Sequence, residues 1–304
     1  LSVNGFYEIK NNSLVKESNL FPIDARVNVV KLINPLSQDL SIMRTNMFYS
    51  ALETLKYNLN RQINDLKCFE IGKVYYMIND KYCEQEKLTI FSCGTFKGDN
   101  WSDQSRLTDF YLMKGVLSQL IDYFMPENIK FKLEELKTSY SDLGLLYFDE
   151  NIGKNKIINK NIFEIGMFSK SVLNQLSIKK PIYYIDINLD LFFQLINKKN
   201  IKYKSVARFP SVRRDLSILV DKDIPYDAIE SNIFNVSGDI LKDIMLFDVY
   251  QGDKLEKDKK SFAISFFFQD QSTTLMDSQV DKEILKIFQS LVKEFNISLR
   301  DGEL

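Results

Sequence analysis

The stretch SFAISFFFQ, residues 261–269, has the alternation of a β-strand with two chemically different faces. Every second residue is large and apolar, which gives a face that helices can bury: Phe262, Ile264, Phe266 and Phe268. The residues between them are small: Ser261, Ala263 and Ser265. The strand therefore predicts a sheet with one apolar face and one face of small, mostly polar groups.

The sequence on either side of this strand predicts the element order β-α-β-β-α-β. Strands are expected at residues 216–220, 244–250, 261–269 and 297–300, and helices at residues 226–236 and 278–295. This order is the split βαβ or ferredoxin-like arrangement. Both helices of that fold pack on one face of the sheet, so Asp248 and Tyr250 are expected to share the open face with Ser261. Such a face is a suitable platform for an unpaired RNA base.

The first two hundred residues predict a different α+β domain, built on a largely antiparallel sheet. A helix is expected up to about residue 60, capped by Ser41 or Asp39, and another over residues 107–124. The first helix has an apolar stripe at helical spacing: Phe48, Leu52, Leu55 and Leu59. Strands are expected at residues 68–76 and 87–93, and around 145–149, 163–168 and 181–189. The predicted domains are residues 1–200 and 207–304, joined by a lysine-rich stretch.

The composition excludes several classes of active site. The chain of 304 residues has no histidine, which excludes Ser-His-Asp and Cys-His catalysis and histidine metal sites. Its three cysteines are too few for a closed zinc site and are expected to be free thiols in a reducing cytosol. Neither common glycine-rich phosphate loop is present. No catalytic residue and no metal ligand is predicted, although an enzyme built on carboxylates and arginine stays open.

The charge and hydropathy patterns bear on partners and location. No apolar run approaches the ~18 residues of a membrane span, and no leader is recognisable, so a cytoplasmic protein is expected. A net charge of −1 argues against indiscriminate nucleic-acid binding. Basic residues nevertheless gather in two places: Lys198, Lys199, Lys202, Lys204, Arg208, Arg213 and Arg214, and then Lys254, Lys257, Lys259 and Lys260. These groups are either solvated linker and hairpin charges or a local rim that contacts phosphates.

Several longer segments resemble one protein family. NPLSQDLSIMRTNMFYSALETLKYNLNR (residues 34–61) and FEIGKVYY (69–76) resemble the β subunit of bacterial phenylalanyl-tRNA synthetase. RFPSVRRDLSILVD (208–221), LFDVYQG (246–252) and KKSFAISFFFQD (259–270) resemble the C-terminal anticodon-binding domain of the same subunit. The matches fall in chain order and cover nearly the whole sequence.

The resemblance implies a class II synthetase-like module without an active site, followed by a ferredoxin-fold anticodon-binding domain. A working class II site needs an arginine for the ATP phosphates and a glycine-rich strand that ends in a second arginine. Arg44 lies in a Met-Arg-Thr sequence, the strand ending at Tyr76 carries lysine and tyrosine, and no glycine-rich strand precedes residue 200. No cofactor is therefore expected in this chain. ATP and Mg²⁺ are expected in the catalytic α subunit, and the family's β-subunit magnesium site lies outside this sequence.

The resemblance also implies partners. In the family the degenerate module pairs with the α subunit in an (αβ)₂ heterotetramer that attaches phenylalanine to tRNA(Phe), with the long helix and exposed sheet surface as interface. The sequence is shorter than the family's β subunit and lacks its OB-fold and editing domains, so no residue is assigned to editing. It also departs from the family at Ser139-Tyr140-Ser141, in place of His-Pro-Gly, and at residues 273–277, where an arginine is missing. Asp277 is still expected to cap the last helix.

The expected RNA-binding residues follow from the family and from chemistry together. Asp248, Tyr250 and Ser261 correspond to residues that lie against the first anticodon base, which is guanine in tRNA(Phe). A carboxylate accepts the two N–H donors of guanine, and an aromatic ring stacks on a base. In the alternative interpretation, Asp248 caps a turn and Tyr250 packs in a subunit interface. The remaining candidates are Arg213 and Arg214, as phosphate neighbours or ion-pair partners of Asp215, and the phosphate-contacting Lys259 and Lys260.

Two other functions stay open at this point. A self-sufficient synthetase-like enzyme would carry out phenylalanine-dependent ATP–pyrophosphate exchange alone. A purely structural module would assemble with the α subunit without reading RNA.

Overall fold

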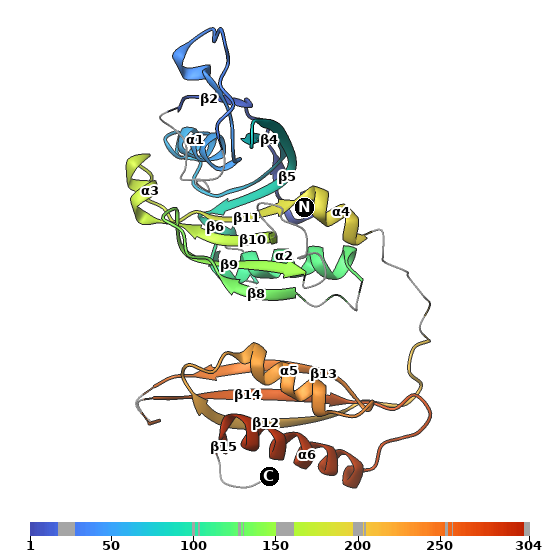
Figure 1. Ribbon diagram of the computed structural model, residues 1–304. Helices are drawn as coiled ribbons and strands as arrows, with labels where there is room; N and C mark the ends of the chain where they lie inside the picture. Colours follow the sequence, from blue (N-terminus) through green and yellow to red (C-terminus); the bar gives the residue numbers. More distant parts are fainter. Residues whose placement is uncertain are drawn as a thin grey trace. The chain divides into compact units, whose positions relative to one another are not determined.

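The computed structural model describes residues 1–17, 28–98, 101–102, 104–126, 129, 131–149, 161–196, 203, 205–252, 255–256 and 258–300. The chain divides into two compact units, Leu1–Ile201 and Lys202–Leu304 (Figure 1). Within the described ranges, no helix has both the length and the apolar character that crossing a membrane requires.

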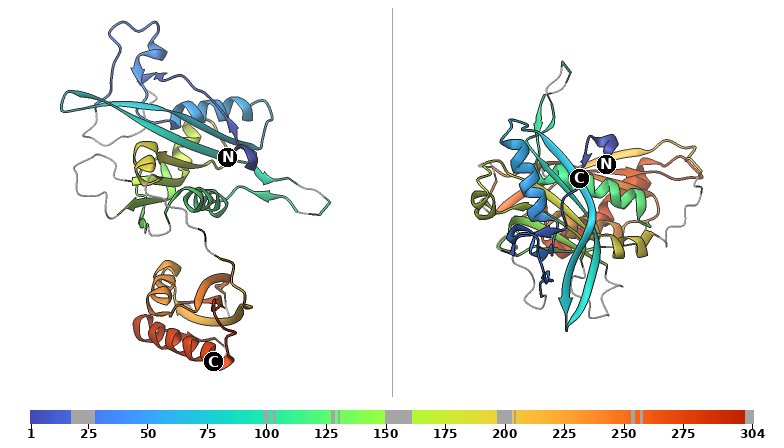
Figure 2. Two further views of the ribbon diagram at one scale, coloured as in Figure 1. Left: turned by 90° about the vertical axis from the view of Figure 1, so that its right-hand side faces the viewer. Right: turned by 90° about the horizontal axis from the view of Figure 1, so that it is seen from above.

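The first unit is built on a seven-stranded sheet with the order β1-β4-β5-β11-β10-β9-β8. Its strands are β1 (Tyr7–Glu8), β4 (Leu66–Ile78), β5 (Lys81–Cys93), β8 (Phe131–Glu135), β9 (Ser141–Asp149), β10 (Asn161–Phe168) and β11 (Tyr183–Asn188). The edge pair β1–β4 is parallel and the other pairs are antiparallel. The predicted α+β class with an antiparallel sheet is therefore confirmed. The β4–β5 hairpin extends beyond its pairing with β11 as a long two-stranded arm (Figure 2).

Helices cover both faces of this sheet. Helices α2 (Phe110–Phe124) and α4 (Leu189–Ile196) pack against one face, around Phe69, Ile90 and Ile185. Helix α1 (Phe48–Leu59) packs against the other, around Cys68, Phe91 and Tyr184. The two sets alternate along the strands, as expected for a sheet with a core on each side. Helix α3 (Lys170–Gln175) joins the α1 side through Leu173.

The start of α1 differs from the sequence-based expectation. Residues Gln38–Leu40 form a 3-10 turn, and β3 (Ile42–Met43) pairs with β2 (Leu14–Val15). This distant pairing holds residues 42–43 in an extended conformation, so the helix begins only at Phe48 and neither Ser41 nor Asp39 caps it. The Asn46 side chain instead accepts a hydrogen bond from the Phe48 amide at 3.0 Å. The predicted apolar stripe on α1 nonetheless faces the core: Phe48, Leu52 and Leu55 are buried and Leu59 packs beside them.

The smaller elements of the first unit were outside the sequence-based expectation. Helices α3 and α4 were not predicted, because each is short and follows a strand directly. The unit also contains η1 (Ser2–Asn4) and a small ribbon of β6 (Thr95–Lys97) and β7 (Arg106–Leu107).

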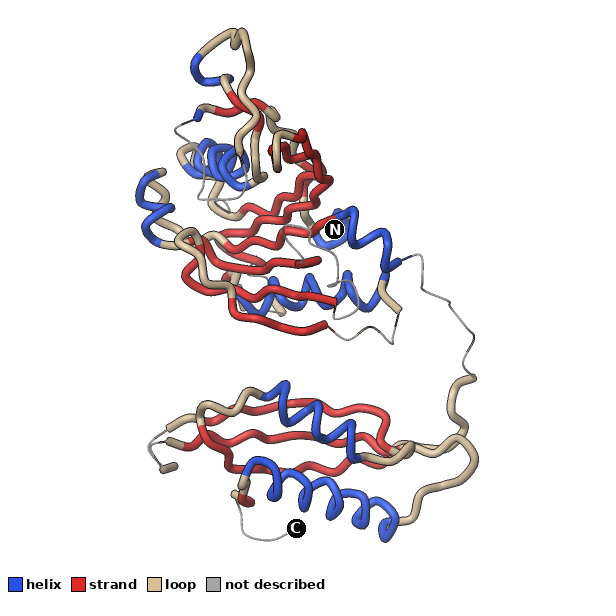
Figure 3. Tube along the Cα trace, viewed as in Figure 1, coloured by secondary structure: helices blue, strands red, loops and turns tan. Residues whose placement is uncertain are grey.

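The second unit has the predicted β-α-β-β-α-β order. It contains β12 (Val212–Asp221), α5 (Tyr226–Val236), β13 (Leu241–Tyr250), β14 (Lys259–Phe268), α6 (Asp277–Phe295) and β15 (Ser298–Leu299). The strands lie in the order β13-β14-β12-β15, and each pair is antiparallel. Both helices lie on the same side of the sheet (Figure 3). The predicted ferredoxin-like fold is therefore confirmed.

The helix-covered face forms the core of this unit. Phe262, Ile264, Phe266 and Phe268 of β14 are buried there with Ile229 and Ile233 of α5 and with Val280, Ile284, Ile287 and Leu291 of α6. Helix α6 repeats apolar residues at intervals of three and four positions, which places them along one side of the helix.

The start of α6 also differs in detail from the expectation. Met276 is the N-cap residue, and the Gln279 side chain accepts a hydrogen bond from the Met276 amide at 2.9 Å. Asp277 is the first helical residue and forms an ion pair with Arg214, so the prediction that Asp277 caps the helix is wrong. Its negative charge still lies in the first turn, where it interacts favourably with the helix dipole.

Candidate functional site

The strand register defines which residues share the uncovered face of the second unit. Residues directly opposite each other in paired strands point to the same side of a sheet. On β13, Tyr250 lies opposite Ser261 and Asp248 lies opposite Ala263. On β12, Leu219 and Ser217 lie opposite the same two β14 residues. Asp248, Tyr250 and Ser261 therefore lie on one face, on the side away from α5 and α6.

A β-bulge in β13 produces this arrangement. Strict alternation would put Ile244, Leu246, Asp248 and Tyr250 on one side of the strand. The register shifts between Leu246 and Asp248, so Phe247 is an extra residue without a direct partner. Before the bulge Ile244 and Leu246 pack into the helix-covered core, and after it Asp248 and Tyr250 lie on the open face. The bulge thus lets one strand supply both the core and the candidate site.

The ring of Tyr250 lies close to two other residues, Arg300 and Gly252. The guanidinium carbon of Arg300 lies 4.9 Å from the centroid of the ring. Arg300 is fixed at its backbone, where its N–H donates to the Ser217 carbonyl at 3.0 Å. On another side, a Cβ atom at position 252 would come within 2.6 Å of the Tyr250 hydroxyl oxygen. The glycine of the LFDVYQG segment is therefore required for this orientation of the tyrosine.

Sequence reasoning did not identify Arg300 as a member of the site. The available signal was its spacing: Arg300 is two residues after Ser298, which pairs with Leu219 on β12, and alternation places both on the open face. Its contact with Tyr250 is a cation–π interaction across the sheet, which cannot be read from spacing alone.

Asp248 and Ser261 differ in accessibility. The Asp248 side chain is exposed, and among the residues that the structure describes it has no hydrogen-bond or ion-pair partner. It therefore does not cap a turn. Ser261 is only 2% exposed, because it is small and lies on the central strand between the larger Tyr250 and Leu219. An approaching ligand meets Asp248 and Tyr250 before it meets the serine.

Arg213 and Lys259 lie on the open face as well. Arg213 forms a two-pronged pair with Asp215, with Nε–Oδ1 and Nη2–Oδ2 distances of 2.8 and 3.0 Å. This guanidinium holds the pKa of the Asp215 carboxyl below its usual value. Lys259 lies opposite Asp221 in the register and forms an ion pair with Glu256 at 3.2 Å. The structure therefore contains the predicted pairing of Arg213 with Asp215, and the phosphate contact stays a prediction.

Arg214 and Lys260, which were also predicted to bind RNA, lie on the other side of the sheet from Asp248 and Tyr250. Arg214 forms ion pairs with Asp277 and Asp281 at the start of α6, not with Asp215. Lys260 is buried, donates to the Lys222 carbonyl at 2.7 Å and lies 5.0 Å from the Phe262 ring centroid. Burial lowers the pKa of Lys260.

Alternation along β12 and β14 places Arg214 and Lys260 on the opposite side of the sheet from their sequence neighbours Arg213 and Lys259. The other lysines of the two basic groups lie outside the described residues: Lys198, Lys199, Lys202, Lys204, Lys254 and Lys257.

In the first unit, Arg44 is bound within the protein. Its Nη1 lies 2.9 Å from Glu70 Oε1, and its Nε donates to the Lys73 carbonyl at 3.0 Å. Both side chains are almost completely buried, with exposed fractions of 2% and 0%. A Cβ atom at position 72 would clash with this guanidinium, so the glycine of FEIGKVYY makes room for it. The arginine is therefore not available to neutralise a nucleotide phosphate.

A row of polar groups crosses the same side of the sheet. Glu70, Thr89, Asp186 and Glu164 are successive cross-strand partners on β4, β5, β11 and β10. Asp186 accepts from Lys87 Nζ at 2.7 Å and from the Thr89 hydroxyl at 2.6 Å.

Glu164 is the end of this row, and no basic side chain of the described residues is in direct contact with it. Its Oε1 accepts from the hydroxyls of Tyr140 and Tyr184 at 2.9 and 2.8 Å. Burial, followed by the nearby Asp186 carboxylate, raises the pKa of Glu164 to about 7. Tyr140 is thus a partner of this carboxyl.

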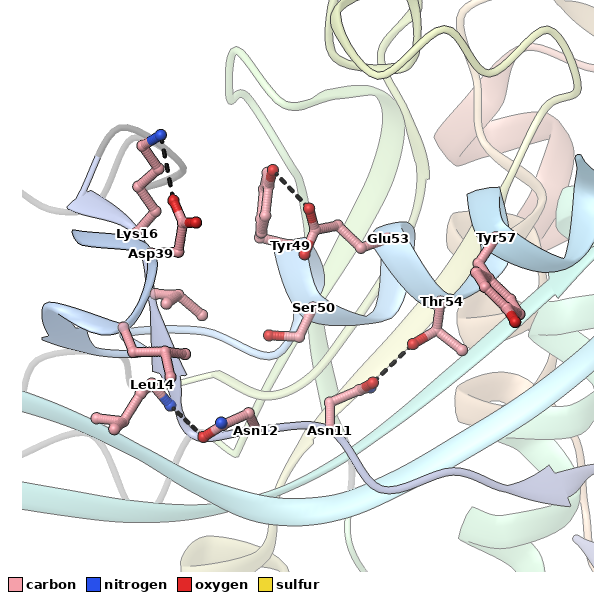
Figure 4. A pocket seen from close by; sticks show the side chains of 12 residues that line it. Asn11, Asn12, Leu14, Lys16, Asp39, Tyr49, Ser50, Glu53, Thr54 and Tyr57 are labelled. Carbon is pink, nitrogen blue, oxygen red and sulfur yellow. Dashed lines mark hydrogen bonds and ion pairs between the residues drawn. The ribbon is translucent and has the colours of Figure 1, made fainter. Parts of the chain in front are cut away.

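An open pocket of about 750 Å³ lies along the outer side of α1 (Figure 4). Its polar side chains pair with one another: Asn11 accepts from Thr54 at 2.6 Å, Tyr49 donates to Glu53 at 3.0 Å, and Lys16 lies 3.3 Å from Asp39. Burial and the Glu53 carboxylate raise the pKa of Tyr49 to about 12. Among the described residues, no cluster of three or more cysteine or acidic side chains could hold a metal ion.

Comparisons with known proteins agree with both folds. Residues 1–189 match the family model "Phenylalanyl tRNA synthetase beta chain CLM domain", and residues 207–300 match "Ferredoxin-fold anticodon binding domain". The phenylalanine–tRNA ligase beta subunit of Bacteroides fragilis is 31% identical, over 97% of this chain and 37% of the relative. That of Thermotoga maritima is 31% identical over 97% of this chain and 36% of the relative, and that of Legionella pneumophila 31% over 99% and 37%.

An α+β synthetase-like module with an antiparallel sheet and a ferredoxin-fold anticodon-binding domain are thus joined in one chain. The chain belongs to the family of phenylalanyl-tRNA synthetase β chains. It spans a little over a third of the length of the curated relatives that it matches, 37% in the case of the Bacteroides protein.

Proposed function

We propose that this chain is the part of a phenylalanine–tRNA ligase β subunit that reads the anticodon of tRNA(Phe) and supports the catalytic α subunit. In this proposal the ATP-dependent attachment of phenylalanine takes place in the α subunit, which binds ATP and Mg²⁺. The complete enzyme is a cytoplasmic (αβ)₂ heterotetramer. The proposal rests on the family membership and on one observation: the exposed Asp248 carboxylate, which has no partner among the described residues, lies on the same face as the ring of Tyr250.

The chemistry of this face matches guanine. The Watson–Crick edge of guanine carries two adjacent N–H donors, which a single carboxylate accepts with charge-assisted hydrogen bonds. Adenine offers a ring nitrogen lone pair at the corresponding place and repels the Asp248 carboxylate. Tyr250 supplies a stacking surface, and the Ser261 hydroxyl lies directly across from it. In this proposal each unit has its own task. The second unit recognises the anticodon, and the first unit supports the α subunit.

The first unit supports a role in assembly. Arg44, the arginine considered for the ATP phosphates, forms a buried ion pair with Glu70 instead. This pair argues against an autonomous synthetase. The outer side of α1, which exposes Tyr57 beside the pocket, is proposed as part of the contact with the α subunit. Phenylalanine-dependent ATP–pyrophosphate exchange by this chain alone would contradict this assignment.

Replacing Asp248 with asparagine tests the recognition role. The chain carrying Asp248→Asn is expected to lose about tenfold of its preference for guanine over adenine. The amide offers one acceptor and one donor in place of two acceptors, so it opposes one of the guanine N–H groups and matches the donor and acceptor of adenine. The measurement is the affinity of the full chain for anticodon stem–loops that differ only in the first anticodon base. Asp227→Asn is the matched control, since it makes the same charge change at an exposed position of α5.

Two outcomes would reject the recognition role. An unchanged guanine preference in Asp248→Asn would remove Asp248 from the site. Absence of any stem–loop binding by the unmodified chain, together with intact binding to the α subunit, would establish the purely structural alternative.

A further inference from the structure

Two phenylalanines and an arginine form a further group on the open face, at the bulge. The guanidinium carbon of Arg213 is 5.7 Å from the centroid of the Phe247 ring and 5.9 Å from that of Phe267. The three residues come from three neighbouring strands, β12, β13 and β14, and Arg213 is the direct partner of Phe267. We define these residues, Arg213, Phe247 and Phe267, as the second platform.

The second platform is exposed and is not part of the core. Phe247 retains 46% of its surface exposure, and Met245 beside it on the same strand retains 44%. Neither residue belongs to the hydrophobic cluster beneath α5 and α6. Because the bulge makes Phe247 an extra residue, a phenylalanine here contributes little to sheet packing. Large apolar groups grouped on an exposed face commonly mark a binding surface.

The platform adjoins the proposed guanine site. Phe247 is covalently next to Asp248, and consecutive Cα atoms are about 3.8 Å apart. Ser265 and Ala263 connect the two places along β14 on the same face. A nucleotide bonded to the guanine therefore reaches Phe247 without crossing to another surface.

The chemistry of the platform favours a base rather than a phosphate. The two-pronged pair with Asp215 largely cancels the positive charge of Arg213, which weakens its attraction for an isolated anion. The same pair fixes the plane of the guanidinium, and a fixed planar cation stacks well on aromatic rings and bases. Every nucleobase has a π-face, so stacking of this kind tolerates any sequence.

We propose that the second platform stacks the base of the nucleotide adjacent to the first anticodon base, without selecting its identity. This inference rests on the proposed anticodon recognition and adds a subsite to it. The occupant is a nucleotide of the same RNA strand. Asp248 selects the guanine, and the platform adds affinity and fixes the direction of the strand.

The test uses the full chain carrying Phe247→Ala and guanine-containing stem–loops. Affinity for the intact loop is expected to fall by about 5- to 150-fold, which corresponds to about 1–3 kcal/mol of lost stacking. A loop with an abasic sugar at one of the two positions beside the guanine should bind the unmodified protein more weakly than the intact loop does, by the same factor. Phe247→Ala should not lower the affinity for this abasic loop any further. Arg213→Lys, which keeps the charge but not the plane, should show a smaller loss in the same direction.

Val249→Ala is the matched control, because Val249 is 47% exposed on the same strand but lies opposite Phe262, on the helix side. The guanine preference of Phe247→Ala should equal that of the unmodified chain. If Phe247→Ala binds like Val249→Ala while the guanine preference is intact, the second platform is wrong and the anticodon proposal stands. An equal loss for intact and both abasic loops would also reject stacking. If the unmodified chain binds no stem–loop, the anticodon proposal itself fails.

Discussion

Replacement of Glu70 by alanine is expected to lower the free energy of unfolding of the first unit by about 3–5 kcal/mol. The change leaves the Arg44 guanidinium buried without its carboxylate partner. It also removes the acceptor for the Asn11 side-chain amide, which donates to Glu70 at 2.7 Å. Differential scanning calorimetry of the full chain, with the transition of the first unit followed separately, measures the effect.

Glu84→Ala provides the control for this experiment. Glu84 pairs with Lys73 at 2.7 Å on the same hairpin, but its side chain is 58% exposed. Exposed pairs of this kind contribute about 0–1 kcal/mol. If Glu70→Ala costs no more than Glu84→Ala, then the Arg44–Glu70 pair does not stabilise the unit. The exchange of both residues for apolar ones, Arg44→Met with Glu70→Leu, should recover much of the loss because no charge stays buried.

The stability of the first unit is expected to fall as the pH rises from about 4.5 to about 7. The pKa of Glu164 is raised from 4.5 to about 7, so the folded state binds this proton more tightly than the unfolded state does. The resulting contribution is fully present below pH 4.5 and is lost as the pH passes through the folded pKa. A shift of this size corresponds to about 3 kcal/mol.

Glu164→Gln should remove this part of the pH dependence. The glutamine oxygen still accepts from the hydroxyls of Tyr140 and Tyr184 but cannot ionise. The variant is therefore expected to be more stable than the unmodified chain above pH 7, as measured by urea unfolding across the pH range. Glu134→Gln, at an exposed ion pair with Lys132, should leave the pH dependence unchanged. If the free energy of unfolding changes with pH to the same extent in both variants, then Glu164 is ionised in the folded protein.

Much of the second unit was predictable because its signals are local. The alternation over residues 261–269 separates the core face from the open face without knowledge of the partner strands. The helical spacing in α5 and α6 is equally local. The same alternation also separates Lys260 from Ser261, and Arg214 from Arg213. Lys260 and Arg214 were predicted to bind RNA together with their sequence neighbours, and the structure places them on the other face of the sheet.

The remaining features depend on contacts between distant segments. The late start of α1 follows from the pairing of β2 with β3, about thirty residues apart in the chain. The burial of Arg44 depends on Glu70 and on the space left by Gly72. The contact between Arg300 and Tyr250 joins the last described residue to a strand at the opposite edge of the sheet. Periodicity within a segment carries no information about such pairs.

The bulge at Phe247 gives β13 one residue more than the facing part of β14. Deleting Phe247 would leave Asp248 directly after Leu246 and still opposite Ala263, so Asp248 and Tyr250 would keep their places on the open face and only the exposed phenylalanine would be lost. If Phe247 instead paired with Ala263 without a bulge, Asp248 and Tyr250 would turn toward α5 and α6, and a carboxylate would face a hydrocarbon interior. The face on which the recognition groups lie therefore depends on how the strand accommodates one residue, and not on the chemical character of that residue.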